Sequence, residues 1–230
     1  MENGFKLSPL DDLPDTGPVA IIDADSLLYF EMNKPTYEEA IEGIIQRLLF
    51  ILTRCNTSRY IAFLTKSRCF RYDIAKTKPY KGNRTKTKKK RPPIFYALSA
   101  YVEQNLNFIY YDNLEADDLV SVVNNKIENS IICSCDKDVL YQNSGIHYDY
   151  RQANFITVND ENAEKFLWKQ VLMGDASDGV PGIPKIGTKL SEQYLEECKN
   201  KDYSSHVFKK YTEKFGNVEG ICKFVETFKL

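Results

Sequence analysis

Short apolar runs alternate with amphipathic segments along the chain as far as residue 150. The run at 19–22 is rich in β-branched residues and predicts a strand, whereas the apolar residues of 38–52 recur at helical spacing. The alternation continues with expected strands at 60–64, 107–111 and 130–134 and expected helices at 94–102 and 116–127. This order favours an α/β fold, with a mostly parallel central sheet flanked by helices on both faces.

Beyond residue 150 the pattern becomes helical only. Asp160 or Asn159 is placed to cap a helix that runs through Leu172, and another helix is expected at 190–198. The stretch between them, GDASDGVPGIPKIGTK, is rich in turn residues. We therefore expect an α/β core at 1–158 and a small helical subdomain at 159–230.

The segment 66–93 has no apolar periodicity and is strongly basic, so we expect a long loop or a partly ordered arch that belongs to the core. The formal net charge of −1 argues against a polyanionic partner, but it hides a separation of charge. Residues 59–91 contain thirteen Lys or Arg and one acid, whereas the remainder contains eighteen basic and thirty-one acidic residues. The basic segment can therefore attract a polyanion such as nucleic acid.

The composition argues against a membrane-spanning protein, a secreted protein and a disulfide-rich scaffold. No stretch approaches the roughly 20 apolar residues of a membrane span, and the N-terminus does not resemble a signal sequence. The six cysteines are too sparse for a disulfide scaffold. We expect a cytoplasmic monomer with reduced thiols and no membrane partner.

Acidic residues follow the expected strands at the ends where an open α/β sheet binds its ligands. The first strand is followed by Asp23 and Asp25, and the strand at 130–134 by Asp136 and Asp138. Carboxylates gathered at one edge repel one another unless cations bind there, and oxygen ligands favour a hard ion such as Mg²⁺ or Mn²⁺. Two such ions about 4 Å apart can activate a water molecule and stabilise a leaving oxygen in phosphodiester hydrolysis.

Two further groups of acids belong to this hypothesis. Glu115, Asp117 and Asp118 open the helix that follows the strand at 107–111, and Asp175 with Asp178 could complete a second ion site from the turn-rich stretch. Each group has a structural alternative. Glu115, Asp117 and Asp118 can cap a helix, Asp23 and Asp25 can form a turn, and Asp136 and Asp138 can be solvated loop residues.

Five ordered motifs resemble the 5′-nuclease family, which contains flap endonucleases, the 5′-nuclease domain of bacterial DNA polymerase I and bacteriophage 5′→3′ exonucleases of the T7-like type. The motifs are IIDADSLLY, FRYDIAKTKPYKGNR, LEADDLV, SCDKDVL and GDASDGVPGIPKIGTK. The resemblance implies metal-dependent hydrolysis near the 5′ ends of duplex, nicked or flapped DNA, with removal of RNA primers from RNA–DNA hybrids as a further substrate. It also implies a helical arch and a helix-three-turn-helix at 174–198.

The resemblance assigns roles residue by residue. It implies that two or three Mg²⁺ ions, replaceable by Mn²⁺, are held by Asp23, Glu115, Asp117, Asp118, Asp136, Asp138, Asp175 and Asp178. Lys81 and Arg84 would contact the scissile phosphate, and Tyr80 would stack on the terminal base. The helix-three-turn-helix would hold duplex phosphate, often with K⁺. The wider set of expected nucleic-acid contacts comprises Arg71, Lys76, Lys78, Lys88, Lys89, Gly179, Gly182, Lys185, Gly187 and Lys189.

The sequence departs from the family after the second strand, where Thr65 or Lys66 stands in place of an Asp. Asp25 could compensate, because it supplies a carboxylate where many relatives have a neutral residue. Two other functions remain open on the sequence alone. One is a ribonuclease of related fold that cuts structured RNA, and the other is a catalytically silent protein that binds branched DNA.

Overall fold

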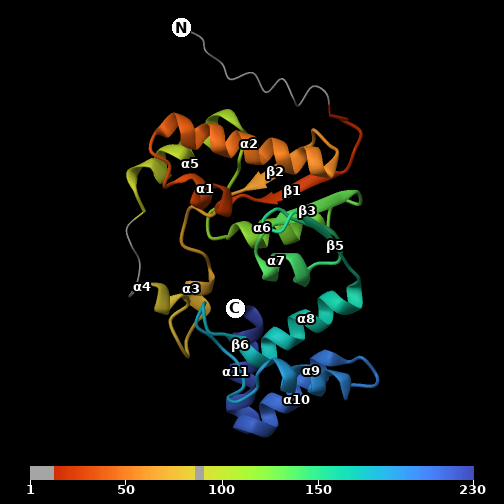
Figure 1. Cartoon of the computed structure of the whole chain (residues 1–230). Coiled ribbons are helices and arrows are strands. Elements are labelled where there is room, and N and C mark those ends of the chain that lie inside the picture. Colours follow the sequence, from red (N-terminus) through yellow and green to blue (C-terminus); the bar gives the residue numbers. More distant parts are fainter. Residues whose placement is uncertain (1–12, 86–90) are drawn as a thin grey trace. The chain divides into compact units, whose positions relative to one another are not determined.

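The computed structural model describes residues 13–85 and 91–230 (Figure 1). The chain divides into two compact units, each described here by itself. The first unit joins residues up to Ser67 with 90–159, and the second joins 68–89 with 160–230. Within the described residues no helix is both long enough and apolar enough to cross a membrane.

A sheet of five strands forms the centre of the first unit, in the order β2-β1-β3-β4-β5. The strands are β1 (Val19–Asp23), β2 (Tyr60–Phe63), β3 (Ser130–Ser134), β4 (Gly145–Asp149) and β5 (Asn154–Val158). The pairings of β1 with β2, of β1 with β3 and of β3 with β4 are parallel, and only β5 is antiparallel. The mostly parallel sheet that the sequence predicts is confirmed.

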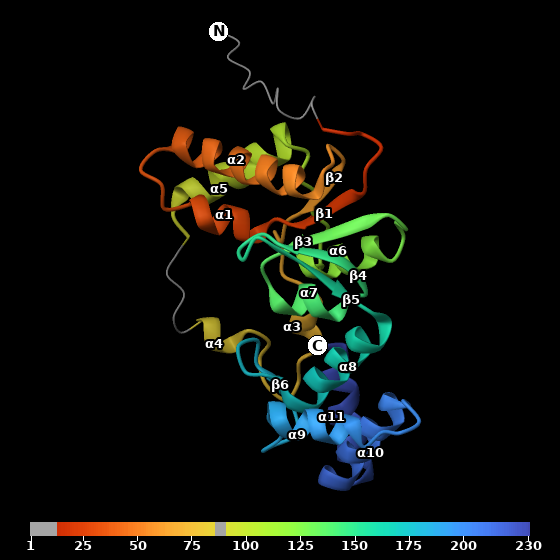
Figure 2. The same ribbon diagram turned by 45° about the vertical axis from the view of Figure 1, so that its right-hand side comes forward.

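Helices cover both faces of this sheet, because successive side chains of a strand point to opposite sides. Ala20 and Ile22 of β1 pack in a cluster with α1 (Asp25–Glu31), α2 (Tyr37–Cys55) and α5 (Pro93–Asn105). Val19 and Ile21 pack instead with α6 (Ala116–Asn124) and α7 (Lys137–Gln142). Both layers are visible in Figure 2. All five residues of β1 are buried, as expected for the central strand of such a fold.

Two expectations for the sheet are wrong. The segment 107–111 is not a strand, since only Ile109 forms a single parallel bridge, with Phe63. Ile109 and Tyr111 are exposed, so this segment at the edge of the sheet lacks the burial that would extend its pairing. The chain beyond 150 is also not helical only, because β5 folds back on β4 before the first C-terminal helix begins. Ile146 and Phe155 are exposed, which explains why the hairpin carries little apolar signal.

The second unit is mainly helical and has its own core. Its long helices are α8 (Asp160–Met173), α9 (Thr188–Glu196), α10 (Tyr203–Phe215) and α11 (Asn217–Lys229). They pack around Trp168, Leu172 and Tyr211. The Tyr211 hydroxyl donates to the carbonyl of Val171 at 2.6 Å, which satisfies the buried polar end of this ring.

The turn-rich stretch between α8 and α9 contains a two-stranded ribbon of β6 (Gly174–Asp175) and β7 (Val180–Pro181). Gly174 has a φ of +69°, and a Cβ there would lie 2.2 Å from the nitrogen of Gly182. A Cβ on Gly182 would lie 2.0 Å from the carbonyl carbon of Met173. Both glycines are therefore required where the two backbones touch.

Residues 68–85 of the basic segment belong to the second unit and not, as expected, to the α/β core. These residues form two short helices, α3 (Arg71–Ile74) and α4 (Gly82–Thr85). Hydrogen bonds from their backbone amides explain why they belong to the second unit. The amide of Lys81 donates to the carbonyl of Asp178 at 2.6 Å, and the amide of Thr77 donates to Glu226 Oε1 of α11 at 2.6 Å.

Candidate active site

Asp23 lies at the carboxyl end of the central strand and is buried, with 7% of its surface exposed. Its Oδ2 accepts a hydrogen bond from the Ser134 hydroxyl at 2.9 Å, at the end of the neighbouring strand β3. Its backbone carbonyl accepts another from the Tyr150 hydroxyl at 2.8 Å. The carboxylate is therefore held from the neighbouring strand β3, and the backbone of Asp23 is held from the turn that follows β4.

Asp25 opens α1 directly after this strand. Its Oδ1 accepts a hydrogen bond from the amide of Thr65 at 2.8 Å, and the Thr65 hydroxyl accepts one from the amide of Ala116 at 2.8 Å. Thr65, one of the two residues expected at the position of the family's acid, thus connects Asp25 to the start of α6. The expectation that Asp25 compensates for the missing acid stays a prediction.

The acids at the start of α6 form a capping box. Glu115 is the N-cap, its side chain accepts from the amide of Asp118, and the Asp118 carboxylate accepts from the amide of Glu115 at 3.0 Å. Asp117 Oδ1 accepts from the amide of Asp118 at 2.7 Å. The capping role that the sequence allows is present. It fixes the direction of these carboxylates without using all of their lone pairs.

Asp136 is the N-cap of α7, and its Oδ1 accepts a hydrogen bond from the amide of Asp138 at 2.9 Å. The amide of Asp136 donates to the Ser134 hydroxyl at 3.0 Å. Asp138 lies 3.9 Å from the ammonium of Lys137. Ser134 therefore connects Asp23 of β1 with Asp136 after β3.

Burial and neighbouring carboxylates raise the pKa values of Asp23 and Asp25. Burial, and then the charge of Asp25, raise the pKa of Asp23 to about 8, against the lowering effect of the Ser134 hydrogen bond; Asp117 and Asp136 raise it further. Burial is also the main cause of the raised pKa of Asp25, which Thr65 and Arg91 oppose and Glu115 increases. Asp23, Asp25, Asp117, Asp136 and Glu115 are thus brought within electrostatic reach at one edge of the sheet.

The fit to a metal ion is incomplete. A bound cation stabilises the ionised form of buried carboxylates whose pKa values are raised, and oxygen donors suit a hard divalent ion. However, within residues 13–85 and 91–230 no three His, Cys, Asp or Glu side chains lie close enough together to hold one ion. The carboxylates of the first unit would have to converge further when an ion binds.

The acids of the second unit are arranged differently. Asp175 Oδ1 accepts hydrogen bonds from the amide and the hydroxyl of Ser177, at 2.7 and 2.6 Å. Asp178 Oδ2 lies 3.7 Å from the ammonium of Lys81 and accepts from the Tyr80 hydroxyl at 3.3 Å. A candidate catalytic lysine and a candidate metal ligand are therefore direct neighbours.

Four expected nucleic-acid contacts are placed unfavourably. Tyr80 is 5% exposed and packs edge to face on Tyr72, so its ring does not offer the open face that base stacking requires. Arg71 donates from Nε to the carbonyl of Leu230 at 2.6 Å. Gly182 serves the contact between β6 and β7, and a Cβ on Gly179 would lie 2.9 Å from the carbonyl oxygen of Pro79. These two glycines are thus explained by packing inside the unit.

Other expected contacts are accessible. Lys76, Lys78, Lys185 and Lys189 are exposed, and so is Gly187, the N-cap of α9, where a Cβ would meet no atom within 4 Å. Arg84 lies in α4, and its side chain is not described. Lys88 and Lys89 lie outside the described residues.

Two site residues were not identified from the sequence, namely Ser134 and Tyr150. Ser134 is fully buried and hydrogen-bonds on both sides. Its signal was its position, as a small hydroxyl residue at the last place of a strand that precedes two acids. Tyr150 carried no such signal, because its contact with Asp23 depends on the β4–β5 hairpin.

Comparison with known proteins agrees with this architecture. Residues 18–166 match the family described as 5'-3' exonuclease, N-terminal resolvase-like domain. A 5'-3' exonuclease of Buchnera aphidicola subsp. Schizaphis graminum is 26% identical over 237 residues, which cover 92% of this chain and 82% of that protein. A DNA polymerase I of Rhizobium leguminosarum is 31% identical over 150 residues, which cover 60% of this chain and 15% of that protein.

Solved structures share the fold. The T5 D15 protein co-crystallised with metal ions superposes with a TM-score of 0.66 at 16% identity, covering 91% of this chain and 87% of that one. The catalytic core of Rad2 in complex with DNA substrate gives a TM-score of 0.55 at 15% identity, covering 96% and 75%. Since the family match spans residues 18–166, well over half of its length, this chain belongs to the 5'-3' exonuclease family with the N-terminal resolvase-like domain.

Proposed function

We propose that this protein is a divalent-metal-dependent 5′ nuclease that hydrolyses phosphodiesters near the 5′ ends of duplex, nicked or flapped DNA. One observation carries the proposal. Asp23 is buried at the end of β1, and its pKa is raised to about 8 by burial and by Asp25, Asp117 and Asp136. A protein gains nothing in stability from such a group, and cation-dependent chemistry is the usual reason to retain it.

The proposed ligands are the carboxylates of Asp23, Asp25, Glu115, Asp117, Asp118, Asp136 and Asp138, with Asp175 and Asp178 from the second unit. Bound divalent ions, Mg²⁺ or Mn²⁺, would activate the attacking water and stabilise the leaving oxygen. The relatives include proteins crystallised with metal ions, among them a T5 5'-exonuclease with zinc, which supports divalent-metal dependence without fixing the ion.

The protein's own residues orient the reacting groups. Ser134 and Thr65 hold Asp23 and Asp25 in fixed directions through hydrogen bonds of 2.9 and 2.8 Å. Attack of a water oxygen on phosphorus breaks the bond to the 3′ oxygen, which takes up a proton, and leaves a 5′-phosphate and a 3′-hydroxyl. Lys81 and Arg84 are the proposed cations that offset the charge of the transition state.

We propose that the second unit grips duplex DNA through a helix-three-turn-helix at 174–198. The exposed backbone at Gly187, which precedes α9, and the exposed Lys185 and Lys189 support a phosphate contact there, and K⁺ could join it. The exposed Lys76 and Lys78 would add contacts to the backbone of the strand. RNA–DNA hybrids remain a further proposed substrate, and a monomer in the cytoplasm the proposed working form.

A second function is favoured by one observation. Because no three of the described acids lie close enough together for one ion, a silent protein that binds branched DNA without cutting it would also have this arrangement. The two functions make opposite predictions in the presence of metal.

The test uses end-labelled DNA in the forms of a nicked, a blunt and a flapped duplex, together with a folded RNA. Each is incubated with the protein and Mg²⁺, Mn²⁺ or EDTA, and the first product is sized. We expect cleavage of DNA from the 5′ side that requires the divalent ion. DNA that is bound but uncut would support the silent protein, and preferential cutting of the folded RNA would support a ribonuclease. The length of the first product separates exonuclease from flap endonuclease cleavage.

A further inference from the structure

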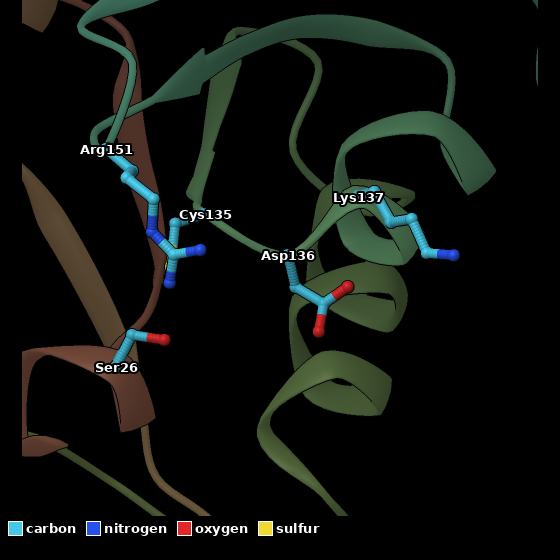
Figure 3. Close-up of a pocket in the computed structure, with 5 residues that line it drawn as sticks. All are labelled: Ser26, Cys135, Asp136, Lys137 and Arg151. Carbon is cyan, nitrogen blue, oxygen red and sulfur yellow. The ribbon is translucent and has the colours of Figure 1, made fainter. Parts of the chain in front are cut away.

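A hollow of about 370 Å³ opens beside the acids of the first unit. It is lined by Ser26, Cys135, Asp136, Lys137 and Arg151 (Figure 3). Ser26 lies in α1, directly after β1, and Cys135 and Asp136 directly follow β3. The hollow therefore lies at the same carboxyl edge of the sheet as Asp23.

The guanidinium of Arg151 is held over this hollow by a sulfur atom and an aromatic ring. Arg151 follows β4 in the turn of the β4–β5 hairpin, and its amide donates to Asp149 Oδ1 at 2.8 Å. Its Nη2 donates to the Cys135 sulfur at 3.3 Å, and its guanidinium carbon lies 5.6 Å from the centre of the Phe30 ring. No carboxylate pairs with this guanidinium anywhere in residues 13–85 and 91–230.

The guanidinium of Arg151 has N–H donors to spare for a ligand in the hollow. A guanidinium has five N–H groups, and Arg151 uses one of them on a weak sulfur acceptor. Figure 3 shows the guanidinium between Cys135 and Ser26, whereas the Lys137 ammonium extends away from it. An anion with several oxygens, such as a phosphate or a carboxylate, matches a planar fork of donors beside a hydroxyl. Of these two groups, nucleic acid presents the phosphate.

We infer that Arg151 and Ser26 bind a phosphate of the nucleic acid next to the phosphodiester that is cut. The inference rests on the proposed function, since it places a substrate phosphate between Arg151 and the acids that would hold the metal. Asp136 lines the hollow and also follows the strand β3, whose last residue Ser134 binds Asp23, so the hollow adjoins the acids that would hold the metal. None of the five family motifs contains Arg151.

The phosphate could be the monoester at a free 5′ end or a diester within the strand. Both present the same oxygens to a guanidinium, so the structure assigns only the shared chemistry. A monoester site would make the protein sensitive to the state of the 5′ end. A diester site would help to position any strand, including a flap.

The experiment compares wild type with Arg151→Ala, Arg151→Lys and Ser26→Ala. Arg59→Ala is the matched control. Arg59 is also an exposed arginine of the first unit whose side chain makes one hydrogen bond, to the carbonyl of Gly17 at 3.1 Å, but it precedes β2 at the amino ends of the strands. Cleavage with Mg²⁺ is measured on a blunt duplex with a 5′-phosphate, the same duplex with a 5′-hydroxyl, and a flapped duplex. Thermal melting confirms that each variant folds.

We expect Arg151→Ala to lower kcat/KM about 10- to 100-fold and Arg151→Lys to restore part of the loss, since a lost hydrogen bond between charged groups has an effect of this size. A loss confined to the 5′-phosphorylated duplex identifies a monoester site, and equal losses on all three substrates identify a diester site. Rates within twofold of wild type on every substrate would overturn the inference.

Binding without divalent ions separates this inference from the proposed function. The affinity for the labelled flapped duplex is measured by fluorescence anisotropy in EDTA over a range of salt. We expect Arg151→Ala to weaken binding and to reduce the salt slope by about 1, whereas Arg59→Ala leaves both unchanged. If wild-type protein cuts none of the substrates, the proposed function fails while the binding result still decides on the phosphate site.

Discussion

The two groups of candidate metal-binding acids differ in how their charge is balanced. In the second unit each acid has a local partner: Asp178 has the Lys81 ammonium at 3.7 Å, and Asp175 accepts two hydrogen bonds from Ser177. In the first unit Asp23 has one hydroxyl donor, and burial, followed by the charges of neighbouring carboxylates, raises its pKa to about 8. The second group is stable as it stands, whereas the first needs a proton or a cation.

The largest expected effect is a loss of cleavage activity when Asp23, the buried acid of the first unit, is replaced. Replacing Asp23 with Asn keeps the size of the side chain and removes one charge from the acid group. We expect Mg²⁺-dependent cleavage to fall by about 1,000-fold or more, because several kcal/mol of transition-state stabilisation depend on the bound ions. Initial rates on the flapped duplex provide the measurement. Asp15→Asn, at an exposed acid of the same unit, serves as the control and should cut like wild type.

The same variant should be more stable than wild type in EDTA, because the folded protein no longer carries a buried ionised carboxylate. The folded-state pKa of Asp23 is raised, so the wild type loses stability as the pH rises from about 4 to about 8. At pH 8 we expect Asp23→Asn to raise the free energy of unfolding by on the order of 3 kcal/mol. Urea denaturation at pH 5 and pH 8 measures the difference.

A stability gain of equal size at both pH values would show that Asp23 is not the titrating group. No gain at pH 8 would mean that the folded protein tolerates the charge without help, and the contrast between the two units would then disappear.

Divalent ions should act on the wild type in the same direction as the Asn substitution. An ion that binds only the folded state stabilises it by about 2.7 kcal/mol at a concentration 100 times its Kd. We expect Mg²⁺ or Mn²⁺ to raise the melting temperature of wild type at pH 8 and to have a much smaller effect on Asp23→Asn. Equal shifts in the two proteins would place the stabilising ion elsewhere, for instance beside Asp175.

The smallest expected effect concerns the second unit. Glu226 of α11 accepts hydrogen bonds of 2.6 Å from the amides of Lys76 and Thr77 and from the Thr77 hydroxyl, and so fastens the basic segment that carries Lys81. We expect Glu226→Gln to lower the free energy of unfolding by about 1 kcal/mol and to increase proteolysis within 71–85. Glu219→Gln is the control, because Glu219 lies on the same helix and forms an ion pair with Lys223 on its surface. We expect this substitution to change the free energy of unfolding by less than about 0.5 kcal/mol.

An unchanged proteolysis pattern in Glu226→Gln would mean that other contacts hold the segment. The adjacent Thr227 hydroxyl, which donates to the carbonyl of Pro181 at 2.7 Å, would then be the next group to remove.

The predictable parts of the fold are those where buried apolar residues recur at the regular spacing of a strand or a helix. The strand at 130–134 matches β3 residue for residue, and the acids after β1 and β3 meet because parallel strands end at one edge. The hairpin of β4 and β5 was missed because its exposed Ile146 and Phe155 blur the alternation. The segment 107–111 has the composition of a strand but lacks a second neighbour.

The candidate site was predictable in its acids and less so in its basic and aromatic residues. Carboxylates at strand ends have positions fixed by the sheet, so Asp23 and Asp136 could be located from the sequence. Tyr80 and Arg71 lie in a segment without periodicity, and their contacts with Asp178 and Leu230 join positions far apart in the chain. No local pattern encodes such contacts.

The hairpin turn at 150–153 can vary in length and sequence more freely than the parallel strands beside it. Tyr150 and Arg151 are carried to the edge of the sheet by a reversal of four residues between β4 and β5, not by a crossover helix. A turn can lengthen, shorten or change residue without altering which strands pair. Inserting one residue after Arg151 would change the path of the turn while β1 and β3 kept their pairing, so the proposed phosphate contact could differ among relatives that keep the same acids.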